Sequence, residues 1–164
     1  MELWRSSARE VIGQLSRGEV SPGELLETLE SRVLAVDPLI NALPIRCFER
    51  ARDHARRMEK TPLEDRGLLC GLPVSIKDLI DISGVRSTYG STIYQDYVPG
   101  RSDRLVKRIE GRGGIIYAKS NTPEFGTGGI TFNDVFGITR NPRNTGFSAG
   151  GSSGGAAASL AAGC

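Results

Sequence analysis

The sequence predicts an α/β fold, and three observations lead to that prediction. Residues 1–66 are rich in charge and hold only three of the 21 glycines, whereas thirteen glycines lie in residues 111–164. Apolar residues in the first segment recur at helical spacing. In the second segment they form two short runs on either side of a helical pattern. We therefore expect a helical N-terminal segment over 1–66 and an α/β core over 67–164.

The first segment is expected to form three helices. Apolar residues recur at helical spacing over residues 4–15, 25–36 and 48–58. Ser21 and Pro22 are typical of an N-cap followed by the first helical position, so they predict where the second helix begins.

The second segment alternates between strands and helices. "LPVSIKDLI" (72–80) and "GIIYAK" (114–119) are apolar runs of strand length, and "SDRLVKRIEGRGG" (102–114) between them is a helical pattern. A strand, a helix and a strand with short links predict a parallel βαβ unit. The small residues of 154–163 predict a further helix that packs closely against the sheet.

Charge, hydropathy and cysteine content limit the class of protein. A net charge of +2 without a basic cluster gives no reason to expect nucleic acid as a partner. The first ten residues lack the apolar core of a signal peptide, and no run of about 18 apolar residues predicts a membrane span. The scattered cysteines Cys47, Cys70 and Cys164 match no metal or disulfide pattern, so we expect no metal site and a reducing, cytoplasmic location.

Lys77 is the first candidate for chemistry. On a strand it shares a face with Ser75, opposite Ile76 and Asp78. A lysine at the end of an apolar strand either reaches water or is desolvated, and burial lowers the pKa of a lysine until its amine can act as a base. The residues alone leave both interpretations open, and the first is the more common fate of a lysine.

A second candidate is "GGIIYAKS" (113–120), which differs by one residue from a phosphate-binding loop, because Ala118 stands where that motif has its second glycine. The three residues from Ile115 to Tyr117 are typical of a strand rather than of a flexible loop. We therefore favour a core strand here over a nucleotide site.

The third candidate is "SAGGSSGG" (148–155), which reads as a flexible linker, a phosphate cradle or a rigid loop that holds a catalytic serine. No charged residue occurs in 145–164, which argues against phosphate binding. A serine nucleophile needs a base. The only histidine, His54, is expected on a solvated helix face, so lysine is the available alternative.

Four ordered motifs carry a resemblance to a known family. They are "GLPVSIKDLIDISGVRSTYGS", "AKSNTPEFGTGG", "GITRNPRNT" and "SAGGSSGGAAASLAAG". Together they resemble the amidase signature family, which includes bacterial amidases, fatty acid amide hydrolase and the A subunit of tRNA-dependent amidotransferases. The resemblance covers about residues 70–164. It implies a mixed sheet flanked by helices, of which this chain would hold the N-terminal portion.

The resemblance also implies site residues and a reaction. Lys77 matches the catalytic lysine of a Ser-Ser-Lys triad, Ser152 matches its bridging serine after a cis peptide bond, and Ser153 would support the hydrogen bonds. The loop Gly126, Thr127, Gly128 and Gly129 would line the substrate pocket. The implied reaction hydrolyses a small-molecule amide to an acid and ammonia or an amine through an acyl-enzyme, with no cofactor. A homo-oligomer of the full-length protein is compatible with this family.

One part of the family pattern is missing. Its nucleophilic serine lies in a later D-[TG]-G-G-S motif, which does not occur among these 164 residues. We therefore expect an N-terminal part of an amidase that is inactive by itself. Two alternatives stay open. The chain is a catalytically inactive fragment that acts as a binding or folding module, or it is part of the A subunit of a tRNA-dependent glutamine amidotransferase.

Overall fold

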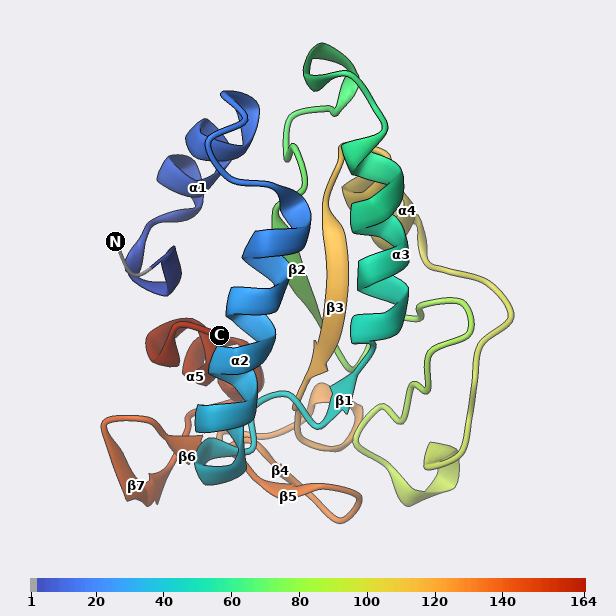
Figure 1. Cartoon of the computed structure of the whole chain (residues 1–164). Helices are drawn as coiled ribbons and strands as arrows, with labels where there is room; N and C mark the ends of the chain where they lie inside the picture. The colour runs from blue at the N-terminus through green and yellow to red at the C-terminus, as the bar shows by residue number, and fades with distance from the viewer. Residues whose placement is uncertain (1–2) are drawn as a thin grey trace.

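The computed structural model describes residues 3–164, and at its centre a small sheet lies between two layers of helices (Figure 1). The sheet contains β1 (Ile45–Arg46), β2 (Pro73–Lys77) and β3 (Ile115–Ser120). The remaining helices and strands are α1 (Ala8–Ser16), α2 (Pro22–Ile40), α3 (Phe48–Glu59), α4 (Arg104–Glu110), α5 (Gly154–Ala162), β4 (Phe132–Asn133), β5 (Gly137–Ile138), β6 (Arg140–Asn141) and β7 (Asn144–Ser148). Short 3-10 helices lie at Leu3–Arg5, Leu63–Asp65, Thr92–Tyr94 and Glu124–Gly126.

The predicted parallel βαβ unit is present. β3 is the central strand, with β2 parallel to it on one side and β1 antiparallel on the other. α4 connects β2 to β3 and is shorter than the predicted 102–114, because Asp103 precedes its first residue and Gly111 follows its last. β2 likewise ends at Lys77 rather than at residue 80. The sequence did not predict β1, which places part of the expected helical segment in the sheet.

The three N-terminal helices form close to their predicted places. Ser21 accepts a hydrogen bond from the backbone of Glu24, whose carboxylate accepts from the backbone of Ser21, so a capping box fixes the start of α2. Ser7 begins α1 in the same way. Trp4 therefore lies before this cap, in the 3-10 helix, and not on the first helix as predicted.

Two apolar clusters fill the two sides of the sheet. α2, α3 and α5 pack on one side, with Ile115, Tyr117 and Ala118 of β3. Val106 of α4 packs on the other side against Ile76 and Ile116. This alternation places Ile76 in the core while Lys77 faces the side that α5 covers, in agreement with the predicted faces of the strand.

The first turn of α5 lies very close to the end of β3. A Cβ atom on Gly155 would lie 2.4 Å from the backbone nitrogen of Asn121 and 2.8 Å from the carbonyl oxygen of Ala42. Both neighbours are backbone atoms and cannot move without shifting the sheet. Glycine at this position therefore sets how closely the serine-containing loop before α5 approaches the strand ends.

Gly155→Ala is accordingly expected to lower the free energy of unfolding by about 1–3 kcal/mol, the usual cost of overpacking. Urea denaturation monitored by circular dichroism measures this effect. Gly100→Ala is the matched control, because a Cβ there meets no atom within 4 Å, and it should stay within about 0.5 kcal/mol of the parent. Equal midpoints for the two variants would show that the α5 contact is looser than described.

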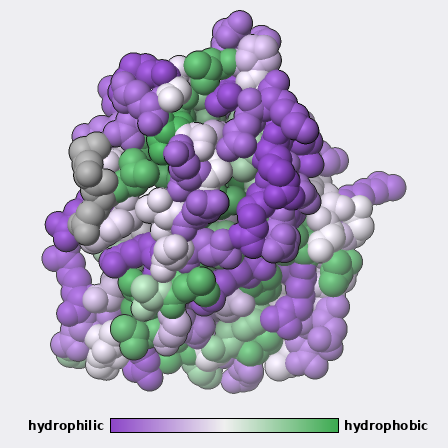
Figure 2. Space-filling model, in the orientation of Figure 1, coloured by the Kyte–Doolittle hydropathy of each residue, from purple (hydrophilic) through white to green (hydrophobic). Residues whose placement is uncertain are grey.

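Apolar surface remains open around α5. A groove of about 410 Å³ lies between α1, α2, β2 and α5, and its walls include Trp4, Leu29, Leu72, Val74 and Leu160. Leu160 of α5 is 77% exposed and Phe147 of β7 is 65% exposed. Figure 2 shows hydrophobic residues scattered among hydrophilic ones on the lower part of this face. Within residues 3–164, no helix has the length and apolar character needed to cross a membrane.

Candidate functional site

The structure brings Lys77 together with the two serines of the glycine-rich tract. Lys77, the last residue of β2, donates from Nζ to Ser152 Oγ at 2.8 Å and to Ser153 Oγ at 3.0 Å. The peptide bond between Gly151 and Ser152 is cis. Ser152 is half-buried and Ser153 exposed, so the contact lies at the surface of the described chain. The tract is thus a folded loop before α5 rather than a linker.

The surroundings of Lys77 disfavour its charged ammonium relative to that of an exposed lysine. Burial lowers its pKa below the ordinary lysine value. The adjacent carboxylate, Asp78, lies on the opposite face of β2 and pairs with Lys119, with 2.6 Å between Lys119 Nζ and Asp78 Oδ1. The segment 145–164 that approaches Lys77 carries no charge. A lysine that is partly desolvated and has two hydroxyls as partners loses its proton more readily than an exposed lysine does, and its neutral amine can then act as a base.

The predicted pocket loop lies directly against the tract. Gly151 donates its backbone N–H to the carbonyl oxygen of Gly129 at 2.9 Å, and a Cβ on Gly151 would lie 2.6 Å from the carbonyl oxygen of Gly128. Thr127, Gly128 and Gly129 are exposed, and Gly126 is half-buried. The loop 126–129 therefore borders the serines on the side that is open to solvent.

Two threonines that the sequence analysis missed hold the tract in place. Thr131 Oγ1 donates to the carbonyl oxygen of Gly150 and accepts from the backbone N–H of Gly154, both at 2.9 Å. Thr122 Oγ1 donates to the carbonyl oxygen of Ser152 at 3.3 Å. Because these hydroxyls bind backbone on both sides of Ser152 and Ser153, they fix the loop without contacting either serine side chain.

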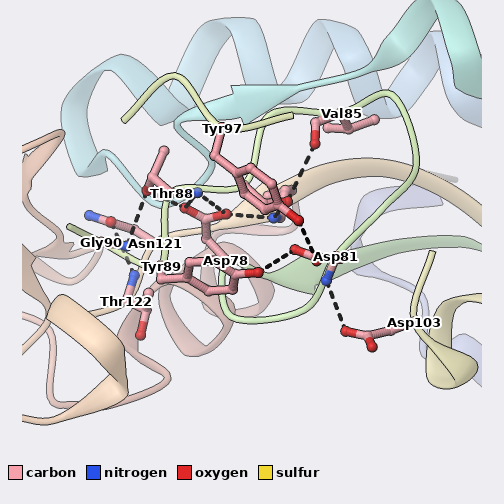
Figure 3. A network of polar contacts seen from close by, with 12 residues as sticks. Asp78, Asp81, Val85, Thr88, Tyr89, Gly90, Tyr97, Asp103, Asn121 and Thr122 are labelled. Carbon is pink, nitrogen blue, oxygen red and sulfur yellow. Dashed lines mark hydrogen bonds and ion pairs between the residues drawn. The ribbon is translucent and has the colours of Figure 1, made fainter. Parts of the chain in front are cut away.

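A buried polar network supports the end of β2 from the other face. Asp78 Oδ2 accepts from Thr88 Oγ1 at 2.5 Å, and Lys119 Nζ also contacts Ser87 Oγ. Figure 3 shows this region, where the hydroxyl of Tyr89 donates to the neighbouring carboxylate of Asp81 at 2.7 Å. The network ties the loop that follows β2 to Lys119 of β3, the strand that pairs with the one carrying Lys77.

The structure does not support the two other candidate sites. Residues 115–120 form a fully buried strand, so they cannot form a phosphate-binding loop, and Lys119 is committed to Asp78. His54 is less solvated than predicted, because its Nδ1 lies 3.5 Å from Glu110 Oε1 and its side chain is 21% exposed. In residues 3–164, no group of three His, Cys, Asp or Glu side chains is placed to hold a metal ion.

Comparison with known proteins identifies relatives of this chain and of its fold. The family model described as Amidase matches residues 24–164. The A subunit of the glutamyl-tRNA(Gln) amidotransferase of Persephonella marina is 35% identical over 165 residues, which cover 99% of this chain and 34% of that protein. Among these relatives the chain spans about a third of the full length.

Solved structures agree with this result. A 6-aminohexanoate cyclic dimer hydrolase superposes with a TM-score of 0.88 and 35% identity, over 98% of this chain and 32% of that one. A bacterial aryl acylamidase of the amidase signature family superposes with a TM-score of 0.87 and 33% identity, over 94% of this chain and 33% of that one.

Proposed function

Because the chain belongs to the amidase family, we propose that it provides the proton-relay half of an amide hydrolase site. In this proposal Lys77 is the base, Ser152 is the bridging serine, and Ser153 supports their hydrogen bonds. The loop from Gly126 to Gly129 lines the entry of a small-molecule amide. The observation that carries the proposal is the 2.8 Å contact between Lys77 Nζ and Ser152 Oγ.

The relay moves one proton in two hydrogen-bonded steps. The lone pair of neutral Lys77 takes the proton of the Ser152 hydroxyl, and Ser152 Oγ takes the proton of a second serine, the nucleophile. That serine forms a bond to the amide carbonyl carbon. As the C–N bond breaks, the proton held on Lys77 returns through Ser152 to the departing ammonia or amine. Water then cleaves the ester of the acyl-enzyme by the same route.

The nucleophile of this reaction has to come from outside residues 1–164, since no D-x-G-G-S motif occurs in them. We therefore expect no measurable turnover of simple amides by the 164-residue chain. A fusion in which it replaces the matching third of the bacterial aryl acylamidase should hydrolyse an aryl amide. The activities of the 164-residue chain and of the fusion are both measured from the absorbance of the released aromatic amine. An inactive but folded fusion would favour the alternative of a catalytically inactive binding or folding module.

A second candidate is the glutamine-hydrolysing reaction of a tRNA-dependent amidotransferase. Several relatives that are up to 40% identical to the chain are A subunits of glutamyl-tRNA(Gln) amidotransferases, and this observation supports the second candidate. The acylamidase fusion does not discriminate the two candidates, because about two thirds of its length comes from the acylamidase. A parallel fusion to the remaining two thirds of the Persephonella marina protein, assayed for ammonia release from glutamine, tests this candidate directly.

A further inference from the structure

The hydroxyl of Ser120 is a buried polar group for which the relay gives no account. Ser120 is the last residue of β3 and is 1% exposed, and its Oγ has no hydrogen-bond partner in the described structure. A buried hydroxyl without a partner costs free energy. We therefore expect the Ser120 hydroxyl to have a hydrogen-bond partner in solution.

Strand register places Ser120 beside Lys77. The two residues are direct partners in the parallel pairing of β2 and β3, so their side chains project from the same face of the sheet. The preceding pair, Lys119 and Ile76, projects from the opposite face, where Lys119 meets Asp78. Ser120 and Lys77 thus share the face that the first turn of α5 covers, next to Ser152 and Ser153.

One N–H group of the neutral Lys77 amine has no hydrogen-bond acceptor in the described structure. A neutral amine has two N–H donors and one lone pair. In the proposed relay the lone pair faces the Ser152 hydroxyl, and Ser153 Oγ, 3.0 Å away, accepts one N–H. The second N–H has no acceptor among the described contacts of Lys77.

We propose that Ser120 is a positioning residue for Lys77, whose hydroxyl accepts this second N–H directly or through one bound water. No hydrogen bond joins Ser120 Oγ to Lys77 Nζ in the described structure, and a change of the χ1 rotamer of Ser120 would let its hydroxyl move toward the amine. With both N–H groups held, the lone pair of Lys77 points at Ser152. The inference rests on the proposed relay, but its test measures the amine itself and not turnover.

The test is an NMR titration of the 164-residue chain labelled with ¹³C and ¹⁵N in lysine, with the Lys77 signal assigned from its loss in Lys77→Met. Ser120→Ala should lower the pKa of Lys77, because the charged ammonium loses more from the missing acceptor than the neutral amine does. The expected change is about three- to tenfold in the ionisation constant. Ser120→Thr keeps a hydroxyl and should restore the parent value. The Lys119 signal is the internal control, since it lies on the other face and should not move.

Unfolding measurements separate this role from a structural one. An unpartnered hydroxyl costs stability, so its removal in Ser120→Ala would leave the unfolding midpoint unchanged or raise it. A hydroxyl bonded to Lys77 predicts a lower midpoint. An unchanged pKa of Lys77 in Ser120→Ala would overturn the inference.

A crystal structure of the parent chain decides the question even if Ser120→Ala does not fold. Ser120 Oγ more than about 4 Å from Lys77 Nζ, with no water shared between them, would also overturn the inference. The results for the Lys77 pKa can be distinguished from the results for the proposed function. An inactive fusion with the shifted pKa would contradict the function alone, and an active fusion with an unshifted pKa would contradict only the role of Ser120.

Discussion

Replacing Lys77 with alanine in the aryl acylamidase fusion is expected to reduce kcat/KM by about 10²- to 10⁴-fold, the usual contribution of a general base. The reason is that Ser152 then has no acceptor for its proton, and the nucleophile beyond it stays protonated. Ser152→Ala should cause a loss of similar size. The double variant should be little worse than either single one, because residues that act as one relay are not additive. Initial rates at saturating and limiting substrate measure these values.

Lys107→Ala is the matched control for Lys77→Ala, since Lys107 is an exposed lysine of α4 on the other side of the sheet. It should leave the rate unchanged. The parent fusion should also lose activity as the pH falls, because only the neutral amine accepts a proton. Burial lowers the pKa of Lys77, so the midpoint of this acidic limb should lie below the ordinary lysine value. Lys77→Ala that keeps a tenth or more of the rate would rule out Lys77 as the base.

Lys119→Met is expected to have the largest effect on stability, a loss of about 3–5 kcal/mol, because it leaves the carboxylate of Asp78 buried without its charge partner. The side chains of Lys119 and Asp78 are 0% and 1% exposed, so water cannot replace the missing ammonium. Urea denaturation of the 164-residue chain at neutral pH measures the change.

A second substitution tests whether the ion pair is the cause. Lys119→Met combined with Asp78→Asn removes both charges and keeps an oxygen that can accept from Thr88. The double variant should be more stable than Lys119→Met alone, whereas Lys107→Met should stay within about 0.5 kcal/mol of the parent. A single Lys119→Met variant that loses under about 1 kcal/mol would mean that Asp78 finds another partner.

The sequence was sufficient for the parts of the fold that depend on periodicity and capping. The parallel βαβ unit and the start of α2 followed from apolar spacing and from Ser21 and Pro22. β1 was missed because two residues are too few to form a periodic pattern. Trp4 was misplaced because its spacing continued the helical pattern across the cap at Ser7.

The candidate site could be predicted from the sequence only in part. The burial of Ile76 and Asp78 agrees with the predicted alternation along β2, which also put Lys77 on the opposite face. Its contact with Ser152 could be anticipated only from the family resemblance, because nothing local in the sequence links two residues so far apart. Thr131 and Thr122 were missed because a hydroxyl that binds backbone leaves no pattern of its own. The catalytic roles of Lys77, Ser152 and Ser153 remain predictions.

The distance along the chain between Lys77 and Ser152 has a consequence for folding. Their contact closes a loop of 75 residues, and closing such a loop costs about 2 kcal/mol more in chain entropy than closing one of about ten residues. A single partly buried hydrogen bond, which contributes about 0.5–1.5 kcal/mol, does not offset that cost. The contact therefore depends on β3, α5 and the threonine-bound loop having already assembled. Its presence in solution, detected through the Lys77 amine, would report on the long-range order of the whole chain rather than on local structure.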